Sequence, residues 1–197
     1  MHERQKEELL RVLKDEVAKV RVGNPQDAAT TIGPVVNKAQ FERVQKYIQV
    51  GIDEGARLVS GGLGRPEGFA RGYFVKPTIF ADVKPTMAIA QEEIFGPVLA
   101  VISYSTEEEA IAIANGTQYG LGAYVFSKDI SHGRAVGTRL QAGRVFLNGK
   151  PSNTAAPMGG YKQSGIGRSM GVFGLEEYLE IKSVYGFEAE AHALPTL

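Results

Sequence analysis

Two adjacent carboxylates and one aromatic ring occur close together in residues 91–98, whose sequence is Gln-Glu-Glu-Ile-Phe-Gly-Pro-Val. Gly96 and Pro97 favour a sharp bend, and the apolar residues 98–104 are typical of a strand entering a core. A rigid turn in front of a strand can aim the carboxylates of Glu92 and Glu93 at a ribose diol and the ring of Phe95 at a flat heterocycle. The same residues also fit a solvated acidic turn with one buried phenylalanine, because charged pairs usually lie on the surface. The residue types alone leave both interpretations open.

Other side chains that could do chemistry are few. The three histidines, His2, His132 and His192, have no carboxylate or second histidine at ligand spacing, which argues against a metal site and against a serine–histidine triad. His132 is expected to be a surface residue. The chain has no cysteine, so it has neither a thiolate nucleophile nor a disulfide. The lysines beside proline or glycine turns are candidates for a substrate-facing cation or for ordinary surface residues, and they are Lys76, Lys150 and Lys162.

The overall charge and hydropathy narrow the class of protein. Lysine plus arginine and aspartate plus glutamate both number 22, so no net field favours nucleic acid or an anionic membrane. No apolar run approaches the ~20 residues of a membrane helix, and the first residues do not resemble a signal peptide. We therefore expect a soluble, cytoplasmic protein without nucleic-acid or membrane partners, and 197 residues suffice for one sizeable core.

Helical and extended patterns alternate along the chain. Residues 3–20 predict an amphipathic helix with Leu9, Leu13, Val17 and Val20 inward, and Asn37 is expected to cap a second helix with Phe41, Val44, Ile48 and Ile52 on one face. Thr106 and Glu109 form a capping-box pattern before a third helix that ends at residues 115–116. Residues 129–140 predict another helix, with Ile130, Val136 and Leu140 inward, and residues 175–182 a brief one. Strands are predicted at residues 56–60, 73–82, 98–104, 120–127, 144–148 and 183–187. This order predicts an α/β fold, with a largely parallel sheet flanked by helices.

Two glycine-rich runs are similar to nucleotide-binding loops, but the elements predicted around them do not fit such a loop. Residues 61–64, Gly-Gly-Leu-Gly, are not followed by a predicted helix, so a hairpin-like turn is expected there. Gly165, Gly167 and Gly171 have the wrong spacing for a dinucleotide fingerprint and no preceding strand. We therefore predict no Rossmann loop in this chain.

Several short motifs, taken in order, identify a family resemblance. From about residue 21 to 187 the chain resembles the C-terminal part of the NAD(P)-dependent aldehyde dehydrogenase family. Any single motif is weak, whereas the ordered set is specific. The motifs are Val-Gly-Asn-Pro (22–25), Ile-Gly-Pro-Val (32–35), Gly-Ala to Gly-Gly (55–62), Lys-Pro-Thr-Ile-Phe (76–80), Gln-Glu-Glu-Ile-Phe-Gly-Pro-Val (91–98), Ala-Asn (114–115) with Tyr-Gly-Leu (119–121), and Pro-Met-Gly-Gly-Tyr-Lys-Gln-Ser-Gly (157–165).

The resemblance implies roles for seven residues. Glu93 would bind the nicotinamide ribose hydroxyls and Phe95 would pack beside the nicotinamide. Gln40 and Arg43 fall where the family often places residues near the adenosine end of the cofactor. The loop before residues 157–160 corresponds to part of the aldehyde tunnel, so Ser152, Asn153 and Met158 would face the substrate. Two residues depart from the usual pattern: Met158 stands where many members have phenylalanine, and Ser169 where many have glutamate.

The absence of cysteine limits the activity that the resemblance implies. The family's reaction needs a cysteine thiolate, an oxyanion site, hydride transfer to nicotinamide and a glutamate base. In the family that cysteine, that glutamate and the main dinucleotide-binding domain precede the part that this chain resembles. We therefore expect a fragment of an aldehyde dehydrogenase, truncated before the first helix, with no catalytic residue of its own, no metal, and weak or no binding of NAD or NADP. A non-enzymatic binding or assembly module, or half of a split enzyme, is the alternative.

The last strand predicts self-association. Residues 183–187, Ser-Val-Tyr-Gly-Phe, would form an exposed edge strand if they stayed unpaired, and family members use their last strand in subunit assembly. We therefore divide the chain into a partial catalytic domain at 1–182 and an oligomerisation strand and tail at 183–197. A homo-oligomer, first of all a dimer, is expected.

Overall fold

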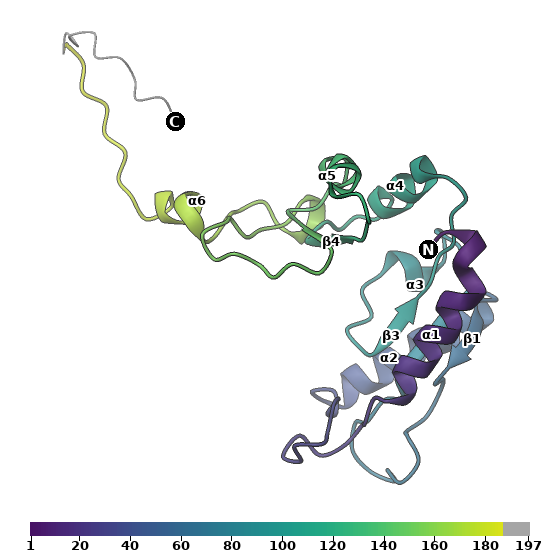
Figure 1. Cartoon of the computed structure of the whole chain (residues 1–197). Coiled ribbons are helices and arrows are strands. Elements are labelled where there is room, and N and C mark those ends of the chain that lie inside the picture. The colour runs from purple at the N-terminus through teal and green to yellow at the C-terminus, as the bar shows by residue number, and fades with distance from the viewer. Residues whose placement is uncertain (187–197) are drawn as a thin grey trace.

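Helices and strands alternate along residues 1–186, the part of the chain that the computed structural model describes (Figure 1). The α-helices are α1 (Lys6–Ala18), α2 (Lys38–Asp53), α3 (Ala88–Gln91), α4 (Glu107–Asn115), α5 (Ile130–Thr138) and α6 (Gly171–Glu176). The strands are β1 (Arg57–Ser60), β2 (Thr78–Ala81), β3 (Val98–Ala100), β4 (Gly122–Val125) and β5 (Arg144–Leu147). Two short 3₁₀ helices, Glu3–Gln5 and Lys162–Ser164, complete this part.

The described strands form two sheets rather than one. In the first, β2 lies between β1 and β3 and pairs antiparallel with β1 and parallel with β3. In the second, β4 and β5 are parallel, with Gly122 opposite Arg144. The antiparallel pair follows from the connection, because the glycine-rich loop between β1 and β2 contains no crossover helix. The α/β class and the hairpin-like turn are thus confirmed, and most strand pairing is parallel.

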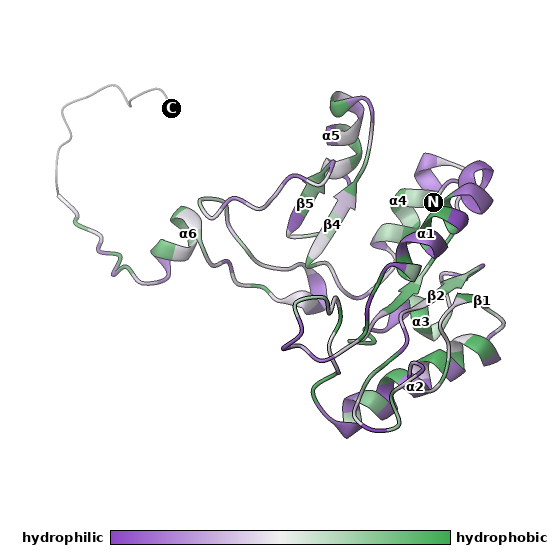
Figure 2. Cartoon of the chain, turned by 60° about the horizontal axis from the view of Figure 1, so that its bottom comes forward, coloured by the Kyte–Doolittle hydropathy of each residue, from purple (hydrophilic) through white to green (hydrophobic). Residues whose placement is uncertain are grey.

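The main core surrounds β2, whose four residues are all buried. Phe80 packs with Val44 and Ile48 of α2 and Ile89 of α3 on one side of the sheet. On the other side Ile79 and Ala81 pack with Leu10 of α1. Figure 2 shows polar and apolar residues alternating along α2, as an amphipathic helix requires.

The two predicted helix caps are present. The Asn37 side-chain oxygen accepts a hydrogen bond from the Gln40 amide at 2.8 Å, and Thr106 Oγ1 accepts one from the Glu109 amide at 3.2 Å. The Glu109 carboxylate accepts from the Ser105 amide at 2.7 Å, one residue before the cap, so the reciprocal bond of the capping box is shifted by one residue. Both caps satisfy amide groups that the first helical turn leaves without partners.

Three residues that were expected to face the core are exposed instead. In α1 the buried leucine is Leu10, 4% exposed, whereas Leu9 is 36% exposed, because the sheet contacts the helix one position further round its axis. Ile52 and Ile130 are also exposed, since each lies at a helix end beyond the neighbouring core. The other predicted inward residues of these helices are buried or half-buried.

Near the C-terminus the elements differ from the prediction. The last helix, α6, covers 171–176 instead of 175–182. Residues 183–186 form no strand within the single chain, which offers them no pairing partner among the described residues, and Phe187 with the tail at 188–197 lies outside those residues. The strand predicted at 98–104 is shorter and ends at Ala100.

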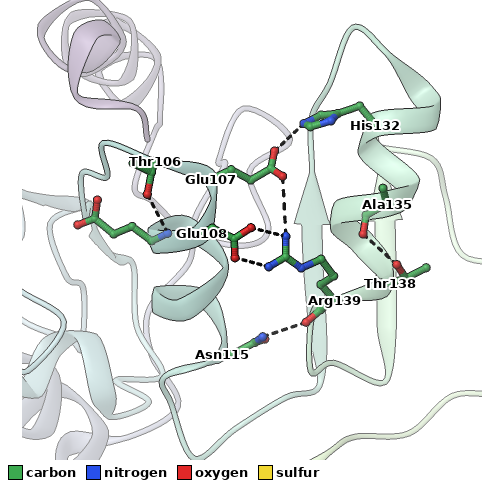
Figure 3. Close-up of polar contacts among 9 residues, drawn as sticks. Thr106, Glu107, Glu108, Asn115, His132, Ala135, Thr138 and Arg139 are labelled. Atoms are coloured by element: carbon green, nitrogen blue, oxygen red, sulfur yellow. Dashed lines mark hydrogen bonds and ion pairs between the residues drawn. The ribbon is translucent and has the colours of Figure 1, made fainter.

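Polar contacts hold α5 beside α4 (Figure 3). His132 Nε2 lies 2.6 Å from Glu107 Oε2, and Arg139 pairs with both carboxylate oxygens of Glu108, one of them at 2.8 Å. This ion pair lowers the pKa of the Glu108 carboxyl. The Asn115 side chain, at the end of α4, donates to the Arg139 carbonyl at 2.9 Å. His132 is exposed as expected, but a carboxylate brought from another helix contacts it.

Candidate active site

The turn at residues 92–97 joins α3 to β3 and lies directly against α2. The Val98 amide donates to the Gly96 carbonyl, and the Thr78 amide donates to the Pro97 carbonyl, each at 2.8 Å. A Cβ on Gly96 would lie 2.5 Å from Val44 Cγ2, so only glycine allows this close approach. The turn is therefore tight and fixed between α2 and the sheet, as residues 96–97 predict.

Two side chains of α2 hold the backbone of this turn. Gln40 Nε2 donates to the carbonyls of Ile94 and Phe95, at 3.0 and 2.9 Å. The Arg43 guanidinium donates to the Glu93 carbonyl at 2.8 Å. Gln40 and Arg43, which the resemblance associates with a cofactor, thus position the turn that carries the other two candidate residues.

The two adjacent glutamates have different surroundings. The Glu92 carboxylate accepts a hydrogen bond from the Tyr47 hydroxyl, which raises the pKa of Tyr47. The Glu93 side chain is exposed, and its carboxylate makes no hydrogen bond or ion pair with any described residue. Glu93 is therefore the carboxylate of the pair that remains available to hydroxyl groups of a ligand.

Phe95 adopts an uncommon conformation. Its φ angle is +56°, in the left-handed region, which bulky residues rarely occupy. Its side chain is 71% exposed, so burial does not explain the strain. A strained backbone that presents an exposed ring on a turn held by Gln40 is typical of a ligand-binding position.

Glu93 and Phe95 line a cavity of about 520 Å³. The opposite wall comes from Tyr119 and Gly120 before β4 and from Gln163 in the short 3₁₀ helix. Lys162 ties these walls together, because its ammonium donates to the carbonyls of Asn115 and Thr117 at 2.6 and 2.9 Å. We call this space the turn cavity.

The sequence alone does not distinguish Lys162 from Lys76 and Lys150. Its contacts make it a structural tie rather than a substrate-facing cation. Ser164 acts in the same way, since its hydroxyl accepts from the Gly120 amide at 3.0 Å. Their shared position in the motif at 157–165 was the available signal.

Ser152, Asn153 and Met158 line a second cavity of about 650 Å³ beside β5 and α5. Lys150 lines it too, whereas Lys76 lines neither this cavity nor the turn cavity. Met158 pairs with Ser169 through two backbone hydrogen bonds of 2.7 and 2.8 Å. The two residues that depart from the family pattern are thus direct neighbours.

The part of the chain that the structure describes contains neither a metal-binding cluster nor a membrane-spanning helix. Within 1–186 no group of three or more His, Cys, Asp or Glu side chains is placed to hold a metal ion. No helix of that part is long and apolar enough to cross a membrane.

The sequence profile of the aldehyde dehydrogenase family matches residues 1–184. The chain belongs to this family. A putative aldehyde dehydrogenase of Staphylococcus haemolyticus is 51% identical over 185 residues, which cover 94% of this chain and 39% of the relative. A second, from Staphylococcus saprophyticus, is 50% identical over 182 residues, covering 92% of this chain and 38% of the relative. The chain thus spans about two-fifths of the length of these curated members.

Solved aldehyde dehydrogenases share the fold. A cysteine-to-alanine mutant of aldehyde dehydrogenase C from Pseudomonas syringae, in complex with NAD⁺ and octanal, is 48% identical with a TM-score of 0.92. The match covers 97% of this chain and 39% of that one. The Mycobacterium tuberculosis enzyme in complex with NAD⁺ is 44% identical with a TM-score of 0.90, covering 96% of this chain and 40% of that one. The family is therefore one of NAD-dependent oxidoreductases.

Proposed function

We propose that this chain is the C-terminal portion of an NAD(P)-dependent aldehyde dehydrogenase and supplies one wall of its active site. The parent activity is the oxidation of an aldehyde to a carboxylic acid. The family match over residues 1–184 and the NAD⁺ complexes of two solved relatives support this assignment. The ordered motifs from residue 22 to 165 support the C-terminal position.

The observation that carries the proposal is the turn with a free carboxylate beside an exposed ring. Glu93 is positioned to accept hydrogen bonds from the ribose hydroxyls of the nicotinamide nucleotide, and Phe95 to pack against its ring. When bound, the cofactor supplies the hydride acceptor. These residues fit it, because the carboxylate lacks a competing partner within 1–186 and the ring stands out from the turn.

Gln40 and Arg43 act chiefly by positioning. Their bonds to three carbonyls of the turn fix where Glu93 and Phe95 project. Arg43 also lines a neighbouring hollow of about 480 Å³ together with Tyr47 and Glu92, on the side where we place the adenosine end. Ser152, Asn153 and Met158 face the aldehyde from the second cavity.

The isolated chain is expected to be inactive. It has no cysteine, and loss of the nucleophile abolishes covalent catalysis. Its contacts cover only part of the cofactor, so we also expect weak or no NAD⁺ binding. Aldehyde-dependent NADH formation by the pure 197-residue chain, or micromolar NAD⁺ affinity by calorimetry, would contradict these expectations.

A hybrid enzyme tests the proposal. This chain replaces the matched 39% of the Staphylococcus haemolyticus relative, and NADH formation from an aldehyde is measured. We expect an active hybrid in which Glu93→Gln raises KM for NAD⁺ roughly tenfold, because hydrogen bonds to a charged acceptor contribute more than those to a neutral one. Glu67→Gln, in the exposed loop between β1 and β2, is the matched control and should leave KM unchanged. An active hybrid that tolerates Glu93→Gln would exclude the ribose role.

Half of a split enzyme is a second candidate. Parallel sheets are normally covered on both faces. The helix α5 covers one face of the β4–β5 pair so closely that a Cβ on Gly137 would lie 3.3 Å from Val145 Cγ1 and 3.6 Å from Leu147 Cδ2. On the other face Tyr124 stacks on Phe146, with ring centroids 4.8 Å apart, and Tyr124 remains largely exposed. Supplying the two pieces of the hybrid as separate chains tests this. Recovered activity would support a split enzyme. If no activity is recovered, the dehydrogenase function requires one continuous chain.

A further inference from the structure

The second cavity has an unusual set of charges. Three cationic side chains line it: Arg134 from α5, Arg144 from β5, and Lys150 from the loop after β5. None of its lining residues is Asp or Glu. We call this space the cationic cavity.

This excess of positive charge is local. The whole chain carries 22 basic and 22 acidic residues, and other arginines pair with carboxylates, as Arg57 does with Asp82 and Arg139 with Glu108. Arg134, Arg144 and Lys150 form no ion pair with any residue of 1–186. Cations gathered around a cavity repel one another and attract an anion into it.

Arg144, which lines the cavity, also carries a donor without a partner within 1–186. Its Nε atom is buried and has no hydrogen-bond partner among the described residues, although buried donors nearly always have one. Its guanidinium carbon lies 5.6 Å from the centroid of the Phe146 ring, which supports the side chain from one side. A guanidinium held in this way suits a planar carboxylate, which can accept two parallel hydrogen bonds from it.

The remaining lining suits a carbon chain. Phe146, Leu147, Pro157 and Met158 give the cavity apolar walls, while Ser152 and Asn153 add polar groups. The Asn153 side-chain oxygen accepts from the Ala155 amide at 2.9 Å, which leaves its amide hydrogens as donors. The lining thus matches an aliphatic chain that ends in an anion.

We propose that the cationic cavity binds a carboxylate at the far end of the aldehyde, so that the substrates are ω-oxo carboxylates. This rests on the proposed function, which puts the nicotinamide ring, and with it the reacting carbon of the aldehyde, beside Phe95. The turn cavity and the cationic cavity share no lining residue. A carboxylate held by Arg134, Arg144 and Lys150 would therefore lie in a separate space from the reacting end.

The first test measures binding to the 197-residue chain. Octanoate and the neutral octanamide, which have equal chain lengths, are titrated while the backbone NMR signals of Ser152 and Asn153 are followed. We expect octanoate to bind at least roughly tenfold more tightly, since charged hydrogen bonds carry the preference. Arg144→Gln should abolish the preference and Arg144→Lys should retain part of it. Arg71→Gln, in an exposed loop outside the cavity, is the control and should change nothing.

Lys150→Gln provides a second variant if Arg144→Gln does not fold, as judged by circular dichroism. Equal affinity for octanoate and octanamide, or a preference that survives both Gln substitutions, would overturn the carboxylate site. Loss of the preference in Arg71→Gln as well would do the same, because it would show a general charge effect.

The second test addresses the substrate. In the hybrid enzyme, kcat/KM is compared for octanal and for its ω-carboxylate analogue, and we expect the analogue to be favoured roughly tenfold, with the preference lost in Arg144→Gln. An active hybrid that favours octanal would overturn the inference and leave the proposed function standing. An inactive hybrid with a clear octanoate preference in the chain would instead count against the proposed function and retain the carboxylate site.

Discussion

At the scale of single residues, the conformation of the turn at 92–97 exposes the Phe95 side chain to a ligand instead of stabilising the fold. Phe95 has a left-handed backbone and a mostly exposed ring, so it contributes strain and little burial. Gln40 offsets that strain, because its side-chain amide donates hydrogen bonds to the backbone carbonyls of Ile94 and Phe95. Side chains kept at such a cost usually serve a ligand.

This arrangement predicts the relative stability of two variants of Phe95. Phe95→Gly should be more stable than Phe95→Ala by about 1 kcal/mol, because glycine adopts the left-handed conformation without the penalty that a Cβ imposes. Urea unfolding of both variants measures the difference. An alanine variant as stable as the glycine variant would mean that the turn relaxes to another conformation once the ring is removed.

At the scale of elements, charged side chains join α1 to the first sheet. The Asp82 carboxylate, just after β2, pairs with Lys6 of α1 and with Arg57 of β1. Arg57 also contacts Glu7 at 2.9 Å. The hydrogen bond from Lys6, and then that from Arg57, lower the pKa of the Asp82 carboxyl below its ordinary value of 3.8. These partly exposed pairs help α1 to remain on the sheet.

The lowered pKa sets the direction of a pH dependence. A carboxyl whose pKa is lower in the folded state stabilises the fold above its unfolded pKa, and this contribution is lost as the pH falls through the folded pKa. Asp82→Asn should therefore cost up to about 1 kcal/mol at neutral pH, and the difference from the original chain should shrink as the pH falls below 3.8. Asparagine tolerates the positive φ of +57° at this position, so the backbone is retained.

Urea unfolding at a series of pH values checks this expectation. Glu8→Gln, on the exposed face of α1, is the control and should show no such convergence. A cost for Asp82→Asn that stays constant down to the lowest pH would show that packing, not charge, is affected.

At the scale of the whole molecule, the C-terminal segment exposes many apolar side chains. Figure 1 shows α6 and residues 177–186 extending away from both sheets. Ile181 and Tyr185 are each 91% exposed, and Val184 is largely exposed. Contiguous exposed apolar residues mark interaction surfaces in stable proteins. We propose that residues 183–187 pair as a strand with a second copy, with 1–182 as the catalytic portion.

Removal of this segment tests the proposal. The 197-residue chain should be a dimer by multi-angle light scattering, whereas the chain ending at residue 182 should be a monomer, because the pairing strand is absent. Tyr185→Asp, which adds a charge to the strand without shortening it, should weaken the dimer as well. A monodisperse monomer of the intact chain at high concentration would contradict the expectation.

Local features were well predicted by the sequence, and long-range features were not. Asn37 and Thr106 were identified as caps because a cap depends on residues only three positions away. Leu10 was missed in favour of Leu9, because both leucines fit a helical stripe and only the position of the sheet decides which is buried. The last strand was predicted at 183–187, but a strand needs a partner, which the single chain does not provide among residues 1–186.

The family and the tight turn at Gly96 and Pro97 can be predicted from the sequence alone, because motif order and turn chemistry depend on neighbouring residues. The residue types alone leave Glu92 and Glu93 equivalent, so that only the family resemblance singles out Glu93, and they give no sign that Arg134, Arg144 and Lys150 share a cavity. Only the tertiary structure decided these points. Glu92 is engaged by Tyr47, 45 positions earlier, and the three cations come from separate segments around one space. Contacts between distant positions depend on how the elements pack, so residue spacing could not reveal them.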